Sequence, residues 1–161
     1  MGLVANMDLG DNMMLRSFRK GKSIFTDRKS PRKLAENVVD ELDVVTPGIS
    51  TPVRRLSGGN VQKVLVGREI ASAPTVLLTA YAVRGLDINS SYTIYDLINR
   101  QKQKGVAVIY VGEDLAVLLE LCDRILVLCG GKVSGMVPGR GAKKREVGMM
   151  MTKLGGEKAD E

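Results

Sequence analysis

The stretch that indicates the fold of this chain most strongly is Leu56-Ser57-Gly58-Gly59-Asn60-Val61-Gln62-Lys63. A serine followed by two glycines predicts the start of a helix, which continues to about Ala71. The N–H groups at such a start lie at the positive end of the helix dipole, and glycine lets a phosphate approach the backbone closely. The same residues also form an ordinary loop-to-helix junction, so the tetrapeptide alone leaves both interpretations open.

The residues before this stretch predict two further helices. Asp8 is expected to cap a short helix through Leu15, and the polar segment 17–29 is expected to be an exposed loop. Ser30-Pro31 reads as the cap and first residue of the next helix. Its apolar stripe contains Leu34, Val38, Val39 and Leu42, and the buried side of the helix after Ser57 is expected to contain Val61, Val64, Leu65 and Ile70.

The residues after Pro74 predict strands that alternate with helices, which indicates a parallel sheet. Ser90 and Ser91 are expected to cap the first of these helices, and Gly130-Gly131 to turn a hairpin. Near-continuous apolar runs also predict strands that are buried on both faces, with Val76–Leu78 beside Val106–Val111. The expected strands are Thr75–Thr79, Val106–Val111, Ile125–Leu128 and Lys132–Met136. The first expected helix ends at about Gln103, the second is Asp114–Leu121 with Glu113 and Asp114 at its start, and the third lies around Arg145–Leu154.

Composition places the chain among ordinary soluble domains, with 161 residues of which 44% are hydrophobic and 26% charged. No apolar run approaches the roughly 18–20 residues that span a bilayer, and the start lacks a secretion signal, so a cytoplasmic location is expected. Cys122 and Cys129 match no common metal or redox spacing and are expected to be buried thiols. The absence of histidine excludes Ser-His and Cys-His pairs and histidine metal sites.

The net charge of +6 arises largely from a basic cluster between Arg16 and Lys33. Such a cluster could contact phosphates of nucleic acid or of lipid headgroups. The chain has only two phenylalanines and four tyrosines, and it shows no helix-turn-helix pattern. A solvated basic face is therefore the preferred interpretation, and no nucleic-acid partner is expected.

Taken with its context, the run Leu56–Lys63 resembles the signature loop of ABC transporter ATPases. It has the Asn-for-Gln form seen in importers of simple sugars and nucleosides. The segment Arg84-Gly85-Leu86-Asp87 is similar to the one that follows Walker B in this family, which makes Asp87 the D-loop aspartate. Further similar segments follow in order along nearly the whole chain: Arg68-Glu69, Cys122-Asp123-Arg124-Ile125, Gly131-Lys132-Val133 and Arg145–Met151.

The resemblance implies an α/β fold, in which a partial parallel sheet of the P-loop ATPase type follows an N-terminal helical subdomain. Residues 1–73 are expected to form the helical subdomain that ends in the signature helix. Residues 74–138 are expected to form the C-terminal half of the ATPase core, and residues 139–161 a C-terminal helix and tail.

The residues that hydrolyse ATP in this family have no counterparts here. No Gly-x4-Gly-Lys-Ser/Thr motif occurs, and the chain resembles the family only from a point after its Q-loop. Ala80 stands at the Walker B aspartate, Tyr81 at the catalytic glutamate and Glu113 at the switch histidine. Tyrosine is a poor base near neutral pH because its pKa is about 10. We therefore expect no catalytic residue, no metal ligand and no ATPase activity in the isolated chain.

The site that the resemblance does imply is a signature loop acting in trans. Ser57, Gly58, Gly59 and Asn60 would contact ATP held by another ATP-binding domain with an intact Walker A motif, while Asp87 would lie at the same interface. Asp87 could instead merely cap the following helix. ATP and Mg²⁺ would bind only in that composite site, and the partners would include the transporter's membrane subunits at the inner face of the membrane.

The resemblance also implies a gap in the sheet, because the strand that carries the P-loop would lie between Val106–Val111 and Ile125–Leu128. We expect these two strands to close on each other. Without closure, the open edges would favour homo-oligomers. The alternative to an ABC half-domain is an interaction or regulatory remnant that binds no nucleotide.

Overall fold

The computed structural model describes residues 2–16 and 27–152, and the statements below concern these residues. They form two compact units, which meet in sequence between Ile109 and Tyr110 and are described separately. The predicted exposed loop at 17–29 lies largely outside the described residues. No described helix has the length and apolar character needed to cross a membrane.

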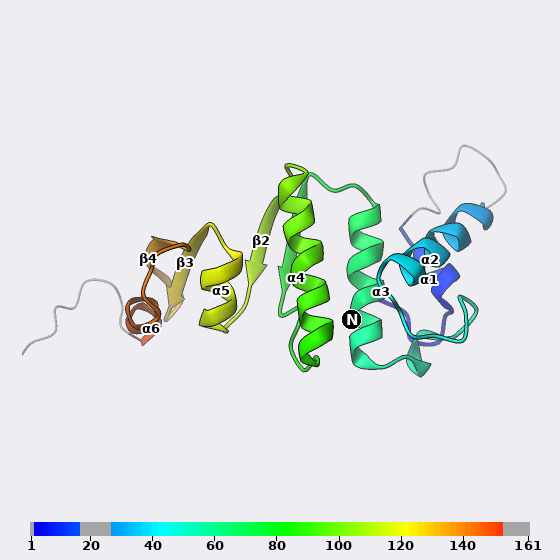
Figure 1. Ribbon diagram of the computed structural model, residues 1–161, viewed down its shortest axis with the longest axis horizontal. Helices are drawn as coiled ribbons and strands as arrows, with labels where there is room; N and C mark the ends of the chain where they lie inside the picture. The colour runs from blue at the N-terminus through cyan, green and yellow to red at the C-terminus, as the bar shows by residue number, and fades with distance from the viewer. Residues whose placement is uncertain (1, 17–26, 153–161) are drawn as a thin grey trace, which may run out of the picture. The chain divides into compact units, whose positions relative to one another are not determined.

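The first unit contains four helices and a short 3-10 turn (Figure 1). The helix that follows Ser57 ends at Ala71, where the sequence predicts its end. The elements are α1 (Leu9–Met14), α2 (Lys29–Glu41), the 3-10 turn (Val53–Arg55), α3 (Gly58–Ala71) and α4 (Ile88–Gln103). Contacts join α1 to α2, α2 to α3 and α3 to α4, so the helices pack in the order of the sequence.

The first helix starts as predicted, whereas the second starts earlier. The Asp8 carboxylate accepts a hydrogen bond of 2.7 Å from the Asp11 amide, which confirms the predicted cap. The predicted cap Ser30 lies inside α2, which begins at Lys29. Asp27 causes this difference, because its carboxylate accepts hydrogen bonds from the Lys29 and Ser30 amides and satisfies the helix start.

The helical core forms where α2 and α3 approach each other at Gly67. A β-carbon at Gly67 would lie 2.7 Å from Val38 Cγ1 and 2.9 Å from Leu42 Cδ1, so only glycine fits without a shift. Val38 and Leu42 are buried as the stripe predicts. Of the residues predicted to be buried on α3, Val64 is fully buried, whereas Val61, Leu65 and Ile70 are only half-buried because Gly67 and Arg68 take the closest contacts.

A buried polar network joins the N-terminal segment to α3. Asn12 is fully buried, and its side chain accepts from the Val4 amide at 2.7 Å and donates to three backbone carbonyls. The buried Arg68 donates to Gly2 O at 2.8 Å and to Glu69 Oε1 at 2.7 Å. Hydrogen bonds thus compensate for the burial of these polar groups.

The first two strands, β1 (Val76–Ala80) and β2 (Ala107–Val111), form a two-stranded parallel sheet. Their adjacency confirms the predicted pairing of Val76–Leu78 with the strand after Val106. The predicted burial on both faces is wrong, because Leu77 is 8% exposed while its neighbours Val76 and Leu78 are 55% and 65% exposed. Successive side chains of a strand point to opposite faces, and the described residues cover only one face.

The second unit contains α5 (Leu115–Leu121), β3 (Arg124–Cys129), β4 (Lys132–Pro138) and α6 (Lys144–Thr152). The two strands form an antiparallel hairpin through Gly130 and Gly131, whose φ angles of 55° and 75° suit glycine and confirm the predicted turn. The core of this unit lies between the hairpin and the two helices. It consists of Leu118, Ile125, Val127, Val137 and Val147.

The predicted closure of the sheet gap, by Ile125–Leu128 on Val106–Val111, stays a prediction. Within the described residues β3 pairs with β4, and β1 pairs with β2 in a separate sheet. The two-glycine turn is short, so closing it costs little conformational entropy. The backbone groups of β3 therefore form their hydrogen bonds with the adjacent antiparallel strand β4. Oligomers through open edges stay a prediction. The two cysteines, predicted to be buried, are only half-buried.

Candidate functional site

The start of α3 is an open, capped helix terminus. Ser57 is the N-cap, and its hydroxyl oxygen accepts a long hydrogen bond of 3.4 Å from the Asn60 amide. Ser57 and Gly58 are exposed, and a β-carbon at Gly58 would meet no atom within 4 Å. An approaching phosphate would therefore meet little steric hindrance at the first turn of the helix.

Asn60 holds this loop through its side chain. Its Oδ1 accepts from the Val45 amide at 3.2 Å, and its Nδ2 donates to the Val45 carbonyl at 3.3 Å and to Ser57 Oγ at 3.0 Å. The amide group thus joins the α2–α3 connection to the cap. The contact of Asn60 with ATP stays a prediction, and its side chain already stabilises the loop through these hydrogen bonds.

The same hydrogen bonds determine what the Ser57 hydroxyl can do. A hydroxyl has one proton to donate and two lone pairs to accept with. Ser57 Oγ accepts from both the amide and the side chain of Asn60, so its proton can point toward an anion outside the helix. The chemistry of this cap therefore suits a phosphate oxygen.

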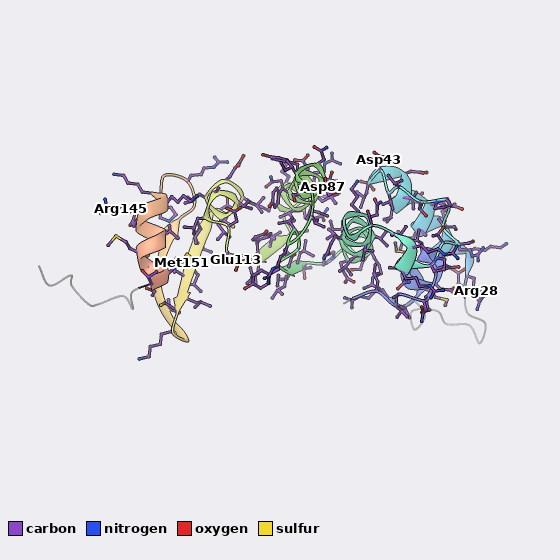
Figure 2. All side chains as sticks on the ribbon, turned by 90° about the horizontal axis from the view of Figure 1, so that it is seen from below. Arg28, Asp43, Asp87, Glu113, Arg145 and Met151 are labelled. Carbon is purple, nitrogen blue, oxygen red and sulfur yellow. The ribbon has the colours of Figure 1, made fainter. Side chains whose placement is uncertain are left out.

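Asp87 is the N-cap of α4, as Figure 2 shows at the start of that helix. Its carboxylate accepts from the Ser90 amide at 2.9 Å and from the Ser90 hydroxyl at 2.7 Å. These two hydrogen bonds lower the pKa of the carboxyl below its usual value. The capping interpretation of Asp87 is thus observed, and the predicted caps Ser90 and Ser91 lie inside the helix.

The two predicted site segments lie together at Gly59. A β-carbon on this glycine would lie 2.7 Å from Ser90 Oγ and 3.5 Å from Asp87 Oδ2. The first turn of α3 therefore packs against the cap of α4, and glycine permits this approach. The sequence did not identify Ser90 as a neighbour of the loop; its spacing three residues after Asp87 is the only local signal.

The turn after β1 contains Tyr81, which the resemblance predicts to stand at the position of the catalytic glutamate. Tyr81 is exposed and has a φ of 53°, which is uncommon for a bulky side chain. The Arg84 guanidinium lies 5.9 Å from the centre of its ring, and the Arg84 amide donates to the Tyr81 carbonyl at 3.1 Å. In the described part of the chain, no three His, Cys, Asp or Glu side chains gather closely enough to hold a metal ion.

The predicted switch position lies in the second unit. Glu113 is exposed in the bend before α5. The next residue, Asp114, caps that helix by accepting from the Ala116 amide at 2.9 Å. This confirms that the two acids begin a helix, where their charge suits the helix dipole.

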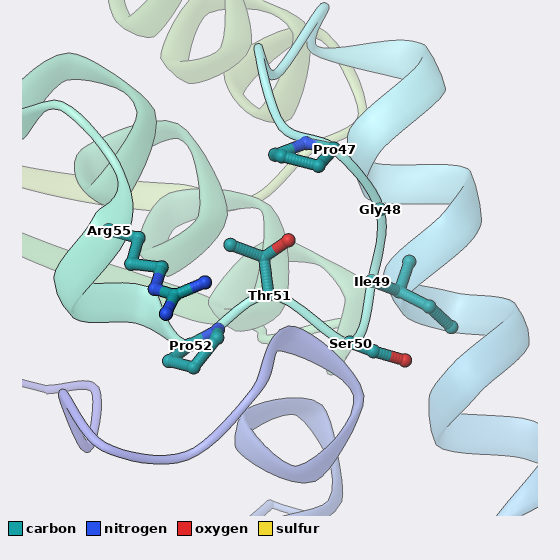
Figure 3. A pocket seen from close by; sticks show the side chains of 7 residues that line it. All are labelled: Pro47, Gly48, Ile49, Ser50, Thr51, Pro52 and Arg55. Carbon is teal, nitrogen blue, oxygen red and sulfur yellow. The ribbon is translucent and has the colours of Figure 1, made fainter.

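Two surface hollows lie in the first unit. The larger, of about 710 Å³, is formed by the loop 47–55, in which Thr51 and Arg55 face each other (Figure 3). The smaller, of about 370 Å³, lies between the end of α2 and the helices α3 and α4. Lys63 and Ser90 line this second hollow, so it adjoins the contact between the two helix starts.

Comparison with known proteins identifies relatives among importer ATPases. The chain is 39% identical over 134 residues to the xylose import ATP-binding protein XylG of Moorella thermoacetica, covering 83% of the chain and 27% of that protein. It is 34% identical over 148 residues to the galactose/methyl galactoside import ATP-binding protein MglA of Escherichia coli, covering 91% of the chain and 29% of that protein. No protein-family model matches the chain.

Solved structures support the same fold. A dimeric bacterial ABC transporter cassette superposes with a TM-score of 0.73 at 23% identity, over 87% of this chain and 60% of that one. The ATP-binding subunit of an ABC transporter superposes with a TM-score of 0.74 at 22% identity, over 94% of this chain and 65% of that one. The chain spans less than a third of the curated relatives that it matches. Over most of its own length, this chain is thus similar in sequence to ATP-binding proteins of sugar importers, and it has the fold of part of an ABC cassette.

Proposed function

We propose that this chain presents its signature loop to ATP held by another ATP-binding domain and does not itself hydrolyse ATP. The observation that carries the proposal is the start of α3, where Ser57 caps an exposed turn and Gly58 leaves the backbone open. A helix start of this kind favours anions through its N–H groups and dipole. The related sequences are ATP-binding proteins, so the anion would be an ATP phosphate.

The turn after β1 supports the non-hydrolysing part of the proposal. Ala80 offers no carboxylate for Mg²⁺, and Tyr81 offers a phenol where a base would act. The ring of Tyr81 is stacked near Arg84, whose positive charge would not assist a metal ion there. ATP and Mg²⁺ would therefore be held mainly by the partner, in a site that this chain completes.

The partner in this proposal is an ATP-binding domain with an intact Walker A motif. One of the superposing cassettes is dimeric, which is the arrangement that a shared ATP site requires. Membrane subunits of a sugar importer would be further partners, at the inner face of the membrane. XylG and MglA are both sugar import proteins, which favours a sugar over a nucleoside as the transported solute.

The test is ATP binding by a related sugar-importer ATPase that has an intact P-loop, with and without this chain. A fluorescent ATP analogue should bind more tightly when the chain is present, and Ser57→Ala should remove at least part of that gain. Ser72→Ala is the matched control, because it removes a hydroxyl at the other end of the same helix. No gain with the chain, or an equal gain with Ser57→Ala, would contradict the proposal.

A second candidate function is an interaction remnant that binds no nucleotide. It is favoured by hydrogen bonds that the side chains of Asn60 and Asp87 form within the chain. Asn60 bonds to the Val45 backbone, and Asp87 caps α4. This candidate predicts that the chain binds its partner equally well with and without ATP. The same titration therefore separates the two functions.

A further inference from the structure

The N-terminal end of α2 contains a cluster of exposed cations. The cluster, which forms the basic end of α2, consists of Arg28, Lys29, Arg32 and Lys33. Further along the same helix the exposed charged residues are the acids Glu36, Asp40 and Glu41. Figure 2 shows Arg28 at the start of this helix and Asp43 just after its end. The positive and negative charges of α2 are thus separated along its length.

This arrangement of charges opposes the stability of the helix. The N-terminus of a helix is the positive end of its dipole, so acids are favourable there and cations are not. The first turn of α2 contains no acid, and its last turn contains no base. Arg28 and Arg32 are four residues apart, as are Lys29 and Lys33, and like charges at this spacing repel each other on a helix. Stabilising α2 therefore does not explain the cluster.

Acids within the chain neutralise little of this charge. Among the described residues, salt bridges join only Arg16, Arg68 and Glu69. The Asp27 carboxylate lies near Lys29, but it already accepts hydrogen bonds from the amides at the start of the helix. Residues 17–26, which precede α2 in the sequence, include no acid. The basic end of α2 is thus an excess of positive charge that suits a negatively charged partner.

The chemistry of the cluster fits a surface of lipid headgroups. An anionic leaflet presents a plane of negative charge, and each basic side chain close to it raises the affinity about fivefold. Nucleic-acid sites commonly add aromatic side chains that stack on bases, and neither α1 nor α2 contains an aromatic residue. The same leaflet would repel the acids of α2, so the helix would approach it with its basic end first.

We propose that the basic end of α2 binds the headgroups of anionic lipids. This inference rests on the proposed function, in which the chain acts beside membrane subunits at the inner face of the membrane, and it adds a direct contact with the lipid. The contact is electrostatic and peripheral, and it requires neither ATP nor a partner domain. Its failure can therefore be distinguished from failure of the signature loop to contact ATP.

The test measures cosedimentation of the full chain with vesicles, without ATP or a partner domain. Vesicles of equal parts phosphatidylserine and phosphatidylcholine should bind the chain, whereas vesicles of phosphatidylcholine alone should not. Binding should weaken as the salt concentration rises to about 0.5 M, because salt shortens the range of electrostatic attraction. The pair Arg28→Gln and Arg32→Gln should weaken binding at least about tenfold. Glutamine retains the Cγ atom of Arg32, which lies beside Gly10.

The matched control is the pair Arg100→Gln and Lys104→Gln, which removes two exposed cations at the same spacing from the end of α4 in the same unit. It should leave the affinity for the vesicles nearly unchanged. Thermal unfolding gives a second readout, because removing cations should raise stability at the start of α2 and lower it at the end of α4.

Three binding results would overturn the proposal: no binding to the anionic vesicles, an equal loss of binding with the two pairs of substitutions, or tighter binding to a DNA duplex than to the vesicles. The last result would assign the phosphates to nucleic acid. A loss of stability with the pair Arg28→Gln and Arg32→Gln would give the cluster a structural role and would also contradict the proposal.

Discussion

The helical part of the chain (residues 2–16 and 27–73) and the two small sheets differ in how fully their apolar side chains are covered. In the helical part, Leu9, Met13 and Val64 are buried, and Asn12 and Arg68 have hydrogen-bond partners for their buried polar groups. In the sheets, every second apolar side chain faces outward, as Val76 and Leu78 do on either side of the buried Leu77.

This difference shows that the helical part buries its own apolar side chains, whereas the sheets do not. Helices satisfy their backbone hydrogen bonds internally, so three of them can form a core from one apolar stripe each. The backbone N–H and C=O groups of a strand form hydrogen bonds only with neighbouring strands, and a parallel sheet needs other elements packed on both of its faces. The candidate signature loop lies in the helical part, whereas the exposed apolar side chains such as Val76 and Leu78 lie on the strands.

The largest expected effect is on the buried network of the helical part. Arg68→Met should lower the free energy of unfolding by about 3 kcal/mol, because it leaves the Gly2 and Asn12 carbonyls and part of Glu69 without their partner. Urea unfolding followed by circular dichroism measures it. Lys63→Met, on the same helix, removes only an exposed hydrogen bond to Asp43 O and should cost much less; equal losses would contradict the self-sufficiency of this region.

Adjacent leucines of β1 compare the two faces of one strand. Leu77→Ala should cost about 2–3 kcal/mol, since it removes a buried side chain. Leu78→Ala should change stability by no more than about 0.5 kcal/mol in the isolated chain, since its side chain faces outward. The same unfolding experiment measures both, and a large loss for Leu78→Ala would show that the outer face is covered.

A smaller effect on stability distinguishes the capping of α3 by Ser57 from its proposed contact with phosphate. Ser57→Ala should cost about 1 kcal/mol through loss of the cap. Ser57→Asp should keep the stability, because aspartate also caps helices, but its charge should repel a phosphate. Thermal unfolding and ATP-analogue binding with the partner domain are the two measurements. If Ser57→Asp supports ATP binding as well as serine does, the loop does not contact phosphate.

The smallest effect concerns pH. Burial raises the pKa of the Glu69 carboxyl, but the hydrogen bonds and charges of Arg16 and Arg68 outweigh it, so the net pKa is lowered. The stability that this carboxylate contributes is therefore present above its unfolded pKa of about 4.3 and is lost as the pH falls through the lower folded value. Urea unfolding should be recorded at several pH values between about pH 6 and pH 3. The free energy of unfolding should fall less steeply with decreasing pH for Glu69→Gln than for the wild type. Equal slopes would mean that this ion pair does not contribute.

Local residues were enough to predict most elements. The caps at Asp8, Ser57 and Asp114 and the turn at Gly130-Gly131 lie where the sequence predicts them, because each depends on hydrogen bonds or φ angles within a few residues. The resemblance to ABC ATPases was likewise visible in the spacing of Ser57–Asn60 and Asp87.

Only the tertiary structure decided how these elements meet. The burial of Arg68 and the approach of Gly59 to Ser90 join residues through contacts that no local pattern contains. The exposure of Val76 and Leu78 was missed for the same reason. An apolar run predicts a strand that can be buried, but it does not predict whether a neighbouring element is present to bury it. Sequence alone thus determined the helices, the hairpin turn and the caps at Asp8, Ser57 and Asp114. The burial of each strand depended instead on which elements pack against it, since hydrophobic burial is a property of the surroundings rather than of the residue.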